Sequence, residues 1–315
     1  MQHYFLGEAI KKRRQELGLT QEQLCEGICE PITISRLENG KQTPSRNRIN
    51  ALLERLDMPA DRYHALLSKN ELEVDALQRE IVSYNAQFEK ATAEEKPQIR
   101  DLALKAHKKL ETVMDADDTL SKQLILRSKV LIGNENGDYS LEEKMRLLTE
   151  AIRMTSPKFD LDDISRGIYT TDEIKIINQL AASYSIAGKS MEAISIWNQL
   201  HKYIKKHFRN IPLTRARLSM VLFNYARELS IIGQYHKAIE IAEEGQKICL
   251  DYGHYLSLPG LLTIQAECNY FVGNDERSRE FYYQAYYLTK VVGHESNLQV
   301  LRENAKKDLN LEFPD

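Results

Sequence analysis

The chain has 315 residues, a length that suits about two domains, and its 42% hydrophobic and 28% charged residues are typical of a globular protein. Its net charge of −3 at pH 7 argues against a uniformly basic nucleic-acid-binding protein. No segment reaches the roughly 18 consecutive apolar residues of a membrane span, so we expect no membrane partner.

The N-terminus and the cysteines indicate a cytoplasmic protein. The first twenty residues lack the pattern of a signal peptide, because basic residues at positions 11–14 occupy the place of its apolar core. Four cysteines are too few for a disulfide framework in a chain of this length. Cys25 and Cys29 have only His3 near them, which is not the spacing of a zinc site, and we interpret all four cysteines as packing residues. We therefore expect no metal and no cofactor.

The charge is distributed unevenly. Residues 1–56 hold nine basic and seven acidic residues, a net charge of +2, whereas the remainder holds 34 basic and 39 acidic residues, a net charge of −5. The N-terminal segment is therefore the place where a positive face meets phosphate groups.

Residues 1–67 read as a bundle of four or five short helices. Thr20 and Gln23 fit a capping box, in which the threonine hydroxyl accepts a bond from a backbone amide and the glutamine returns one. Other residues in this stretch begin or end helices, namely Gly18, Pro31, the pair Asn39-Gly40 and Ser45.

From residue 71 the sequence is helical almost throughout, because it shows no sustained alternation of period two and few β-branched runs. Segments 71–91 and 96–114 are separated by Lys96-Pro97, and each is apolar on one side only. We interpret residues 68–115 as a connecting helical hairpin.

A repeat follows. The segments LAASYSIAGKSMEAISIW (180–197), YARELSIIGQYHKAIEIA (225–242) and QAECNYFVGNDERSREFY (265–282) align on Gly188, Gly233 and Gly273. Small residues recur seven before and five after each glycine, at Ala181, Ala226 and Ala266 and at Ala193, Ala238 and Ser278, and Trp197, Ala242 and Tyr282 follow at plus nine. The glycines are 45 and 40 residues apart, and such a period in an all-helical chain predicts a solenoid of helix pairs.

These patterns resemble two known families. Residues 7–56 resemble the lambda-repressor-like helix-turn-helix through LGLTQEQL and TISRLENGKQTPS, and the repeats resemble degenerate tetratricopeptide repeats. Together, over essentially the whole chain, they resemble the peptide-pheromone-responsive regulators of Gram-positive bacteria, the PlcR/PrgX/Rgg/ComR group. The resemblance implies an all-α fold, with an N-terminal helix-turn-helix bundle (1–67), the connecting hairpin (68–115) and a right-handed α-solenoid that binds a peptide and dimerises (116–315).

The resemblance also implies which residues meet DNA. The third helix, about Pro31 to Asn39, is expected to enter the major groove, with Arg36 on a guanine edge and Ile32 and the Thr33 methyl on a thymine methyl. For Arg36 a phosphate contact or a solvated charge remains an alternative. The expected DNA-binding residues are Gln21, Pro31, Ile32, Thr33, Ser35, Arg36, Asn39, Lys41, Arg46 and Arg48. Arg14 and Glu38 match a pair that ties helix one to helix three.

By the same resemblance, the first helix of each repeat lines a concave peptide-binding face. An asparagine amide there can bond both the C=O and the N–H of an extended peptide, and an arginine can take a carboxylate. The expected peptide-binding residues are Asn178, Ala182, Ser185, Phe223, Asn224, Arg227, Thr263, Glu267 and Tyr270. The alternative is that this face is solvated or contacts the next helix.

The sequence carries no P-loop, no glycine-rich dinucleotide turn, no HExxH and no paired Cys/His nucleophile, so we expect no enzymatic activity. The main interpretation is a homodimeric transcription regulator that binds two half-sites of double-stranded DNA and is controlled by a short imported signalling peptide, as in quorum sensing. Two alternatives remain open, a protein-interaction adaptor and a ligand-independent repressor.

Overall fold

The computed structural model describes residues 6–58, 69–133, 138–207, 212–253, 255–292 and 295–314. Over these ranges the chain is built from α-helices and short 3-10 turns and contains no strand. It divides into two compact units, residues 1–180 and 181–315. The predicted all-α fold class is confirmed, and the predicted domain boundaries at residues 67 and 115 remain a prediction.

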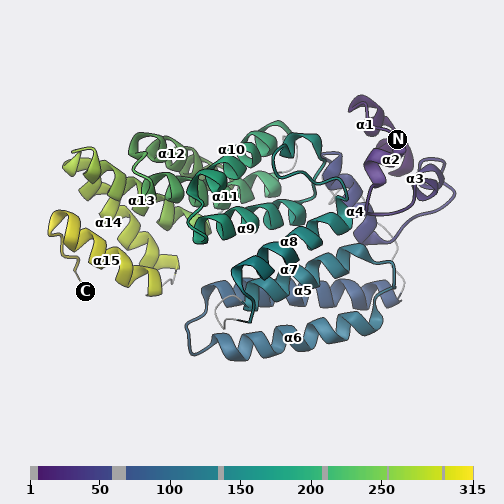
Figure 1. Cartoon of the computed structure of the whole chain (residues 1–315), viewed down its shortest axis with the longest axis horizontal. Helices are drawn as coiled ribbons and strands as arrows, with labels where there is room; N and C mark the ends of the chain where they lie inside the picture. The colour runs from purple at the N-terminus through teal and green to yellow at the C-terminus, as the bar shows by residue number, and fades with distance from the viewer. Residues whose placement is uncertain are drawn as a thin grey trace. The chain divides into compact units, whose positions relative to one another are not determined.

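The N-terminal head of the first unit contains four short helices, α1 (Leu6–Glu16), α2 (Gln21–Cys25), α3 (Pro31–Glu38) and α4 (Arg46–Arg55), drawn in purple in Figure 1. Each of them turns apolar side chains into one core, whose innermost members are Ile10, Leu24, Ile34, Ile49, Leu52, Leu53 and Leu56. Burial of about 1.5–3 kcal/mol per large side chain is what holds such short helices in place.

The predicted helix boundaries of the head are confirmed. The Thr20 hydroxyl accepts a bond from the Gln23 amide at 3.1 Å, and the Gln23 side chain accepts one from the Thr20 amide at 2.8 Å. Pro31 is the first residue of α3, and Gly40 ends that helix with a φ of +66°. The Ser45 hydroxyl accepts from the Arg48 amide at the start of α4.

The rest of the first unit consists of α5 (Lys69–Lys90), α6 (Lys96–Val113), α7 (Thr119–Gly133), α8 (Leu141–Thr155) and the first part of α9 (Thr171–Ile186). Helices α5 and α6 lie side by side as the predicted hairpin, with α7 next to them (Figure 1). A buried chain of hydrogen bonds joins these three helices. The Ser128 hydroxyl donates to the side-chain oxygen Oδ1 of Asn85 at 2.6 Å, and it lies 2.8 Å from His107 Nε2.

Arg55, the last residue of α4, connects the head to α8 and α9. Its guanidinium is buried and donates to the carbonyl oxygens of Leu24 and Glu26 inside the head, at 2.9 and 2.8 Å. It also donates to the carbonyl oxygen of Thr155 at 2.8 Å and to the Glu173 carboxylate at 3.4 Å. One buried cation thus binds acceptors from α2, the turn after it, the end of α8 and the start of α9.

Glu173, the anionic partner of Arg55, has no exposed surface. The hydroxyls of Thr155 and Ser156 donate to its Oε1 at 2.6 and 2.7 Å, and the Thr170 amide donates to Oε2 at 2.6 Å. Because a buried ion pair is tolerated only when its remaining hydrogen-bonding groups are satisfied, these donors make the pair possible.

The turn between α2 and α3 lies directly against the end of α8. Gly27 has a φ of +71°, and a Cβ atom built on it would lie 2.2 Å from the carbonyl oxygen of Thr155. The Thr119 hydroxyl donates to the Gly27 carbonyl at 2.7 Å, and Lys158 forms a 2.8 Å ion pair with Glu26. The turn that sets the angle between α2 and α3 is therefore held from both sides.

The second unit contains α10 (Ser190–His207), α11 (Pro212–Ile231), α12 (Tyr235–Tyr252), α13 (Leu258–Phe271), α14 (Asp275–Val292) and α15 (Glu295–Leu309). Helix α9 runs across the boundary of the units and is followed by α10, so that three predicted helix pairs are observed. Each pair turns at its glycine, and Gly188, Gly233 and Gly273 have φ values of +74°, +77° and +82°. Such left-handed positions suit glycine because it lacks a Cβ atom.

The small residues of the repeats occupy the positions where paired helices approach each other. All six predicted positions are fully buried, namely Ala181, Ala193, Ala226, Ala238, Ala266 and Ser278. Trp197, Ala242 and Tyr282 are also buried, at 2% exposure or less. The tetratricopeptide-like repeat prediction is confirmed at these positions.

Among the described residues, none of the helices combines the length and the apolar character required to traverse a bilayer.

The close approach at Gly27 yields a stability prediction. We expect Gly27→Ala to destabilise the protein by about 1–2 kcal/mol for the left-handed backbone and by a further ~1–3 kcal/mol for the clash with Thr155. Gly18→Ala is the matched control, since Gly18 has a φ of +67° and no neighbour within 4 Å of a built Cβ atom. Urea unfolding of both variants measures the difference, and equal losses would contradict the clash.

Candidate functional site

The exposed face of α3 is the first candidate interface. Ile34 and Leu37 point into the head core, which leaves Ile32 and Arg36 on the outside, one turn apart on the same side of the helix. Ile32 is 55% exposed, an unusual position for a large apolar side chain on a helix of eight residues. Thr33, Pro31 and Ser35 are half-buried beside them.

Buried polar contacts hold α3 to the two helices before it. Arg14 of α1 donates to both carboxylate oxygens of Glu38, at 2.6 and 2.9 Å, and these bonds raise the pKa of Arg14 above its ordinary value. The pairing of Arg14 with Glu38 is thus observed. Gln21 of α2, expected to contact phosphate, donates its amide to the same Glu38 at 2.8 Å. Its side chain therefore ties α3 to α2 in this structure.

The C-terminal side of α3 contains both local hydrogen bonds and exposed charges. The Asn39 amide donates to the Ser35 carbonyl at 2.7 Å. Arg36 lies 3.4 Å from Gln42, an exposed residue that the sequence had not marked as functional. Lys41 is exposed in the loop that follows.

The start of α4 brings Arg46 and Arg48 next to acidic residues of the same unit. Arg46 is exposed, whereas Arg48 forms a 2.8 Å ion pair with Asp117, in the turn before α7. The Arg48 guanidinium holds the pKa of Asp117 below its ordinary value. Asp75, Asp115 and Asp118 border a small cavity with residues 45–48. Sequence reasoning missed Asp117 because it is 69 residues away from Arg48.

The predicted peptide face in the second unit lies on neighbouring helices. Phe223 of α11 approaches α13 so closely that a Cβ atom on Gly260 would lie 2.4 Å from its ring. Asn224, Thr263 and Tyr270 are half-buried, and Arg227 is exposed. The structure thus brings the α11 and α13 residues together on adjacent helices, with Phe223 at their contact.

Several of the predicted peptide-binding residues already have partners. Ser185 donates to Glu228 at 2.5 Å, Thr263 donates to the Pro259 carbonyl at 3.0 Å, and Glu267 accepts from Asn304 at 2.6 Å. Burial raises the pKa of Glu267 above its ordinary value.

The remaining two predicted residues belong to α9. Asn178 lies in the first unit, is only 5% exposed and takes part in an interaction within the structure. Ala182 is half-buried in the second unit.

His107 and Ser128, whose Nε2 and Oγ atoms lie 2.8 Å apart, have the residue types of a nucleophile and its base. Ser128 donates its proton to Asn85, so the His107 nitrogen must donate to the serine oxygen and cannot serve as its base. Both side chains are at most 1% exposed, and burial lowers the pKa of His107 to about 4. We assign this pair to packing. The described residues hold no cluster of His, Cys, Asp and Glu that suits a metal ion.

Known proteins share the N-terminal segment and the fold of this chain. Residues 10–62 match a family model described as Helix-turn-helix. The crystal structure of Bacillus thuringiensis PlcR in complex with the peptide PapR7 and DNA has a TM-score of 0.56 at 18% identity, over 94% of this chain and 98% of that one. The apo form of the competence regulator ComR from Streptococcus vestibularis has a TM-score of 0.54 at 15% identity, over 96% and 98%.

The fold also occurs outside DNA-binding regulators. Aspartyl phosphate phosphatase F from Bacillus subtilis has a TM-score of 0.53 at 15% identity, over 98% of this chain and 80% of that one. No curated protein matches the sequence. Residues 10–62 therefore belong to the helix-turn-helix family, and the chain as a whole has the fold of the PlcR and ComR regulators.

Proposed function

We propose that the chain is a cytoplasmic transcription regulator that reads operator DNA with α3. The observation that carries the proposal is the pair Ile32 and Arg36, exposed on a helix that Arg14, Gln21 and Glu38 hold rigidly. An apolar side chain beside a guanidinium suits a thymine methyl next to a guanine edge. One head covers few base pairs, so the regulator acts as a homodimer on two half-sites.

We further propose that a short linear signalling peptide controls this regulator in quorum sensing. The supporting observations are the adjacent helices α11 and α13, where Phe223 packs against Gly260, with Asn224 and Arg227 also on α11 and Tyr270 also on α13. The PlcR structure contains both a peptide and DNA, and it supports the same combination of ligands for this chain. For the peptide to act as a switch, it must bind one arrangement of the heads more tightly than the other.

The alternatives differ in what the repeats bind. An adaptor would bury a large interface with a folded partner, on the order of 1,200–2,000 Å², and a ligand-independent repressor would bind DNA without any peptide. Because a phosphatase has a similar fold, the absence of enzymatic activity stays a prediction. The helix-turn-helix match at residues 10–62 favours the regulator over the alternatives.

The DNA proposal is tested with fluorescence anisotropy on labelled DNA from upstream of the gene, compared with scrambled DNA. We expect Arg36→Ala to lose about 1–3 kcal/mol of affinity for the operator and little for scrambled DNA, because a base contact carries sequence information. Lys41→Ala is the control and should weaken both DNAs equally, as loss of a phosphate contact does. Equal weakening by Arg36→Ala would assign this residue to the DNA backbone instead.

The ion pair between Arg48 and Asp117 opposes phosphate binding in this proposal. Asp117→Asn should free Arg48 and remove a repulsive charge, which strengthens binding to operator and scrambled DNA by up to about fivefold at low salt, as expected for an exposed ion pair. Asp101→Asn, at an exposed carboxylate of α6, is the charge-matched control. An unchanged affinity in Asp117→Asn would mean that Arg48 does not contact DNA.

The peptide proposal is tested with the peptide-sized fraction of spent culture medium. We expect this fraction to alter the DNA affinity of the wild-type protein and to have no effect on Asn224→Ala, whose basal DNA binding remains. Asn198→Ala, at a half-buried asparagine on α10, is the control and should respond normally. A wild-type protein that ignores the fraction would favour the ligand-independent repressor, and no preference for operator DNA would favour the adaptor.

A further inference from the structure

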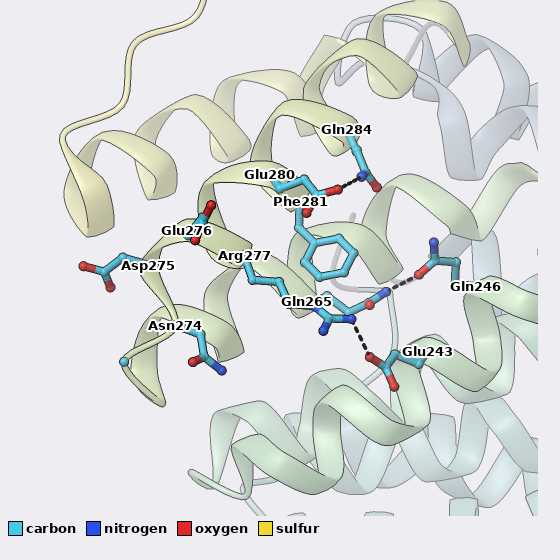
Figure 2. Close-up of a pocket in the computed structure, with 11 residues that line it drawn as sticks. Glu243, Gln246, Gln265, Asn274, Asp275, Glu276, Arg277, Glu280, Phe281 and Gln284 are labelled. Atoms are coloured by element: carbon cyan, nitrogen blue, oxygen red, sulfur yellow. Dashed lines mark hydrogen bonds and ion pairs between the residues drawn. The ribbon is translucent and has the colours of Figure 1, made fainter.

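A groove in the second unit lies between α12 and the N-terminal half of α14, away from the residues assigned to DNA or to the signalling peptide. Its volume is about 850 Å³, within the range of ligand-binding clefts. Figure 2 shows its walls, with Glu243 and Gln246 from α12 on one side and Arg277, Phe281 and Glu280 from α14 on the other.

The groove is acidic. Four carboxylates border it, those of Glu243, Asp275, Glu276 and Glu280, against the single guanidinium of Arg277. Asp275 and Glu276 stand in the first turn of α14, where the helix dipole favours acidic residues for structural reasons alone. Glu243 and Glu280 lie inside their helices and are exposed along the groove, where Glu243 pairs with Arg277 and Glu280 accepts a hydrogen bond from Gln284 at 3.0 Å.

The floor of the groove holds an acceptor without a donor. Gln265 of α13 has no exposed surface, and its Oε1 has no hydrogen-bond partner. Its Nε2 donates to Gln246 Oε1 at 2.8 Å and is 3.4 Å from the Leu261 carbonyl, which fixes the orientation of the amide. A buried acceptor without a donor destabilises the folded protein, and a ligand with an N–H group that reaches it removes this cost.

Arg277 indicates which cation fits. Its guanidinium carbon lies 5.6 Å from the centre of the Phe281 ring, and it pairs with Glu243 at 3.4 Å. The groove thus already accommodates one guanidinium between an aromatic face and a carboxylate, in an exposed and therefore weak arrangement. Guanidinium groups suit such a site better than ammonium groups because they are planar and carry five donors.

We propose that this groove binds a basic, arginine-containing linear segment of a partner protein. An incoming arginine displaces Arg277 from Glu243 and the Phe281 ring, which uncovers the buried Gln265. It then donates to the Gln265 oxygen and pairs with Glu243 and Glu280 at the rim. The volume exceeds that of one side chain, so flanking residues of the segment occupy the rest of the groove. The inference does not depend on DNA binding or on the signalling peptide.

The test uses the full-length protein and a fluorescein-labelled hexa-arginine peptide, with binding measured by anisotropy at physiological salt. We expect saturable binding that the double variant Glu243→Gln/Glu280→Gln weakens at least tenfold. Glu192→Gln/Glu303→Gln removes the same charge from two exposed positions of the second unit outside the groove, and it should change binding less than twofold. Equal weakening by both double variants would overturn the proposal in favour of non-specific attraction.

Two further arms sharpen the test. Gln265→Leu removes the buried acceptor without a change of charge, and we expect it to weaken hexa-arginine binding severalfold when circular dichroism shows an intact fold. Should this variant not fold, the comparison of the two double variants decides. Hexalysine should bind more weakly than hexa-arginine. Complete displacement of the peptide by an equal concentration of spermine would assign the groove to a polyamine and overturn the proposed segment.

Discussion

The buried guanidinium of Arg55 is the contact on which the geometry of the first unit depends. A charged group away from water must find acceptors, and Arg55 finds them in α2, the turn after α2, the end of α8 and Glu173 of α9. Removing one partner of such a buried pair costs about 3–5 kcal/mol, because the other charge remains unpaired. Arg55 therefore binds the head to the helices that follow it, together with the contacts around Gly27.

That contact also fixes the position of α3, the helix proposed to read DNA. The turn held by Arg55 contains Gly27, which fits against Thr155 only because it has no side chain. Helix α3 begins directly after this turn, and Glu38 at its other end is bound by Arg14 and Gln21. A movement of α8 or α9 would therefore reach α3 through backbone contacts.

The repeat unit follows a different physical rule. Its paired helices approach closely at fully buried alanines, and polar side chains join neighbouring pairs, as Ser185 does to Glu228 and Asn304 does to Glu267. The first helices of the pairs carry the surface assigned to the signalling peptide, and the second helices α12 and α14 carry the acidic groove. The two proposed binding surfaces therefore have separate chemistry and consist of different residues on one set of repeats.

The local structure of this protein can be predicted from its residues, because caps, left-handed glycines and small residues at fixed spacing act within a few residues of each other. Thr20 with Gln23, Pro31, Gly40 and the three repeat glycines fall into this class. The long-range partners of Arg48, Arg55 and Gln265 emerge only in the folded chain, since those contacts join residues 19 to 118 positions apart. No sequence pattern specifies such pairs, whose distances are set by packing of whole helices.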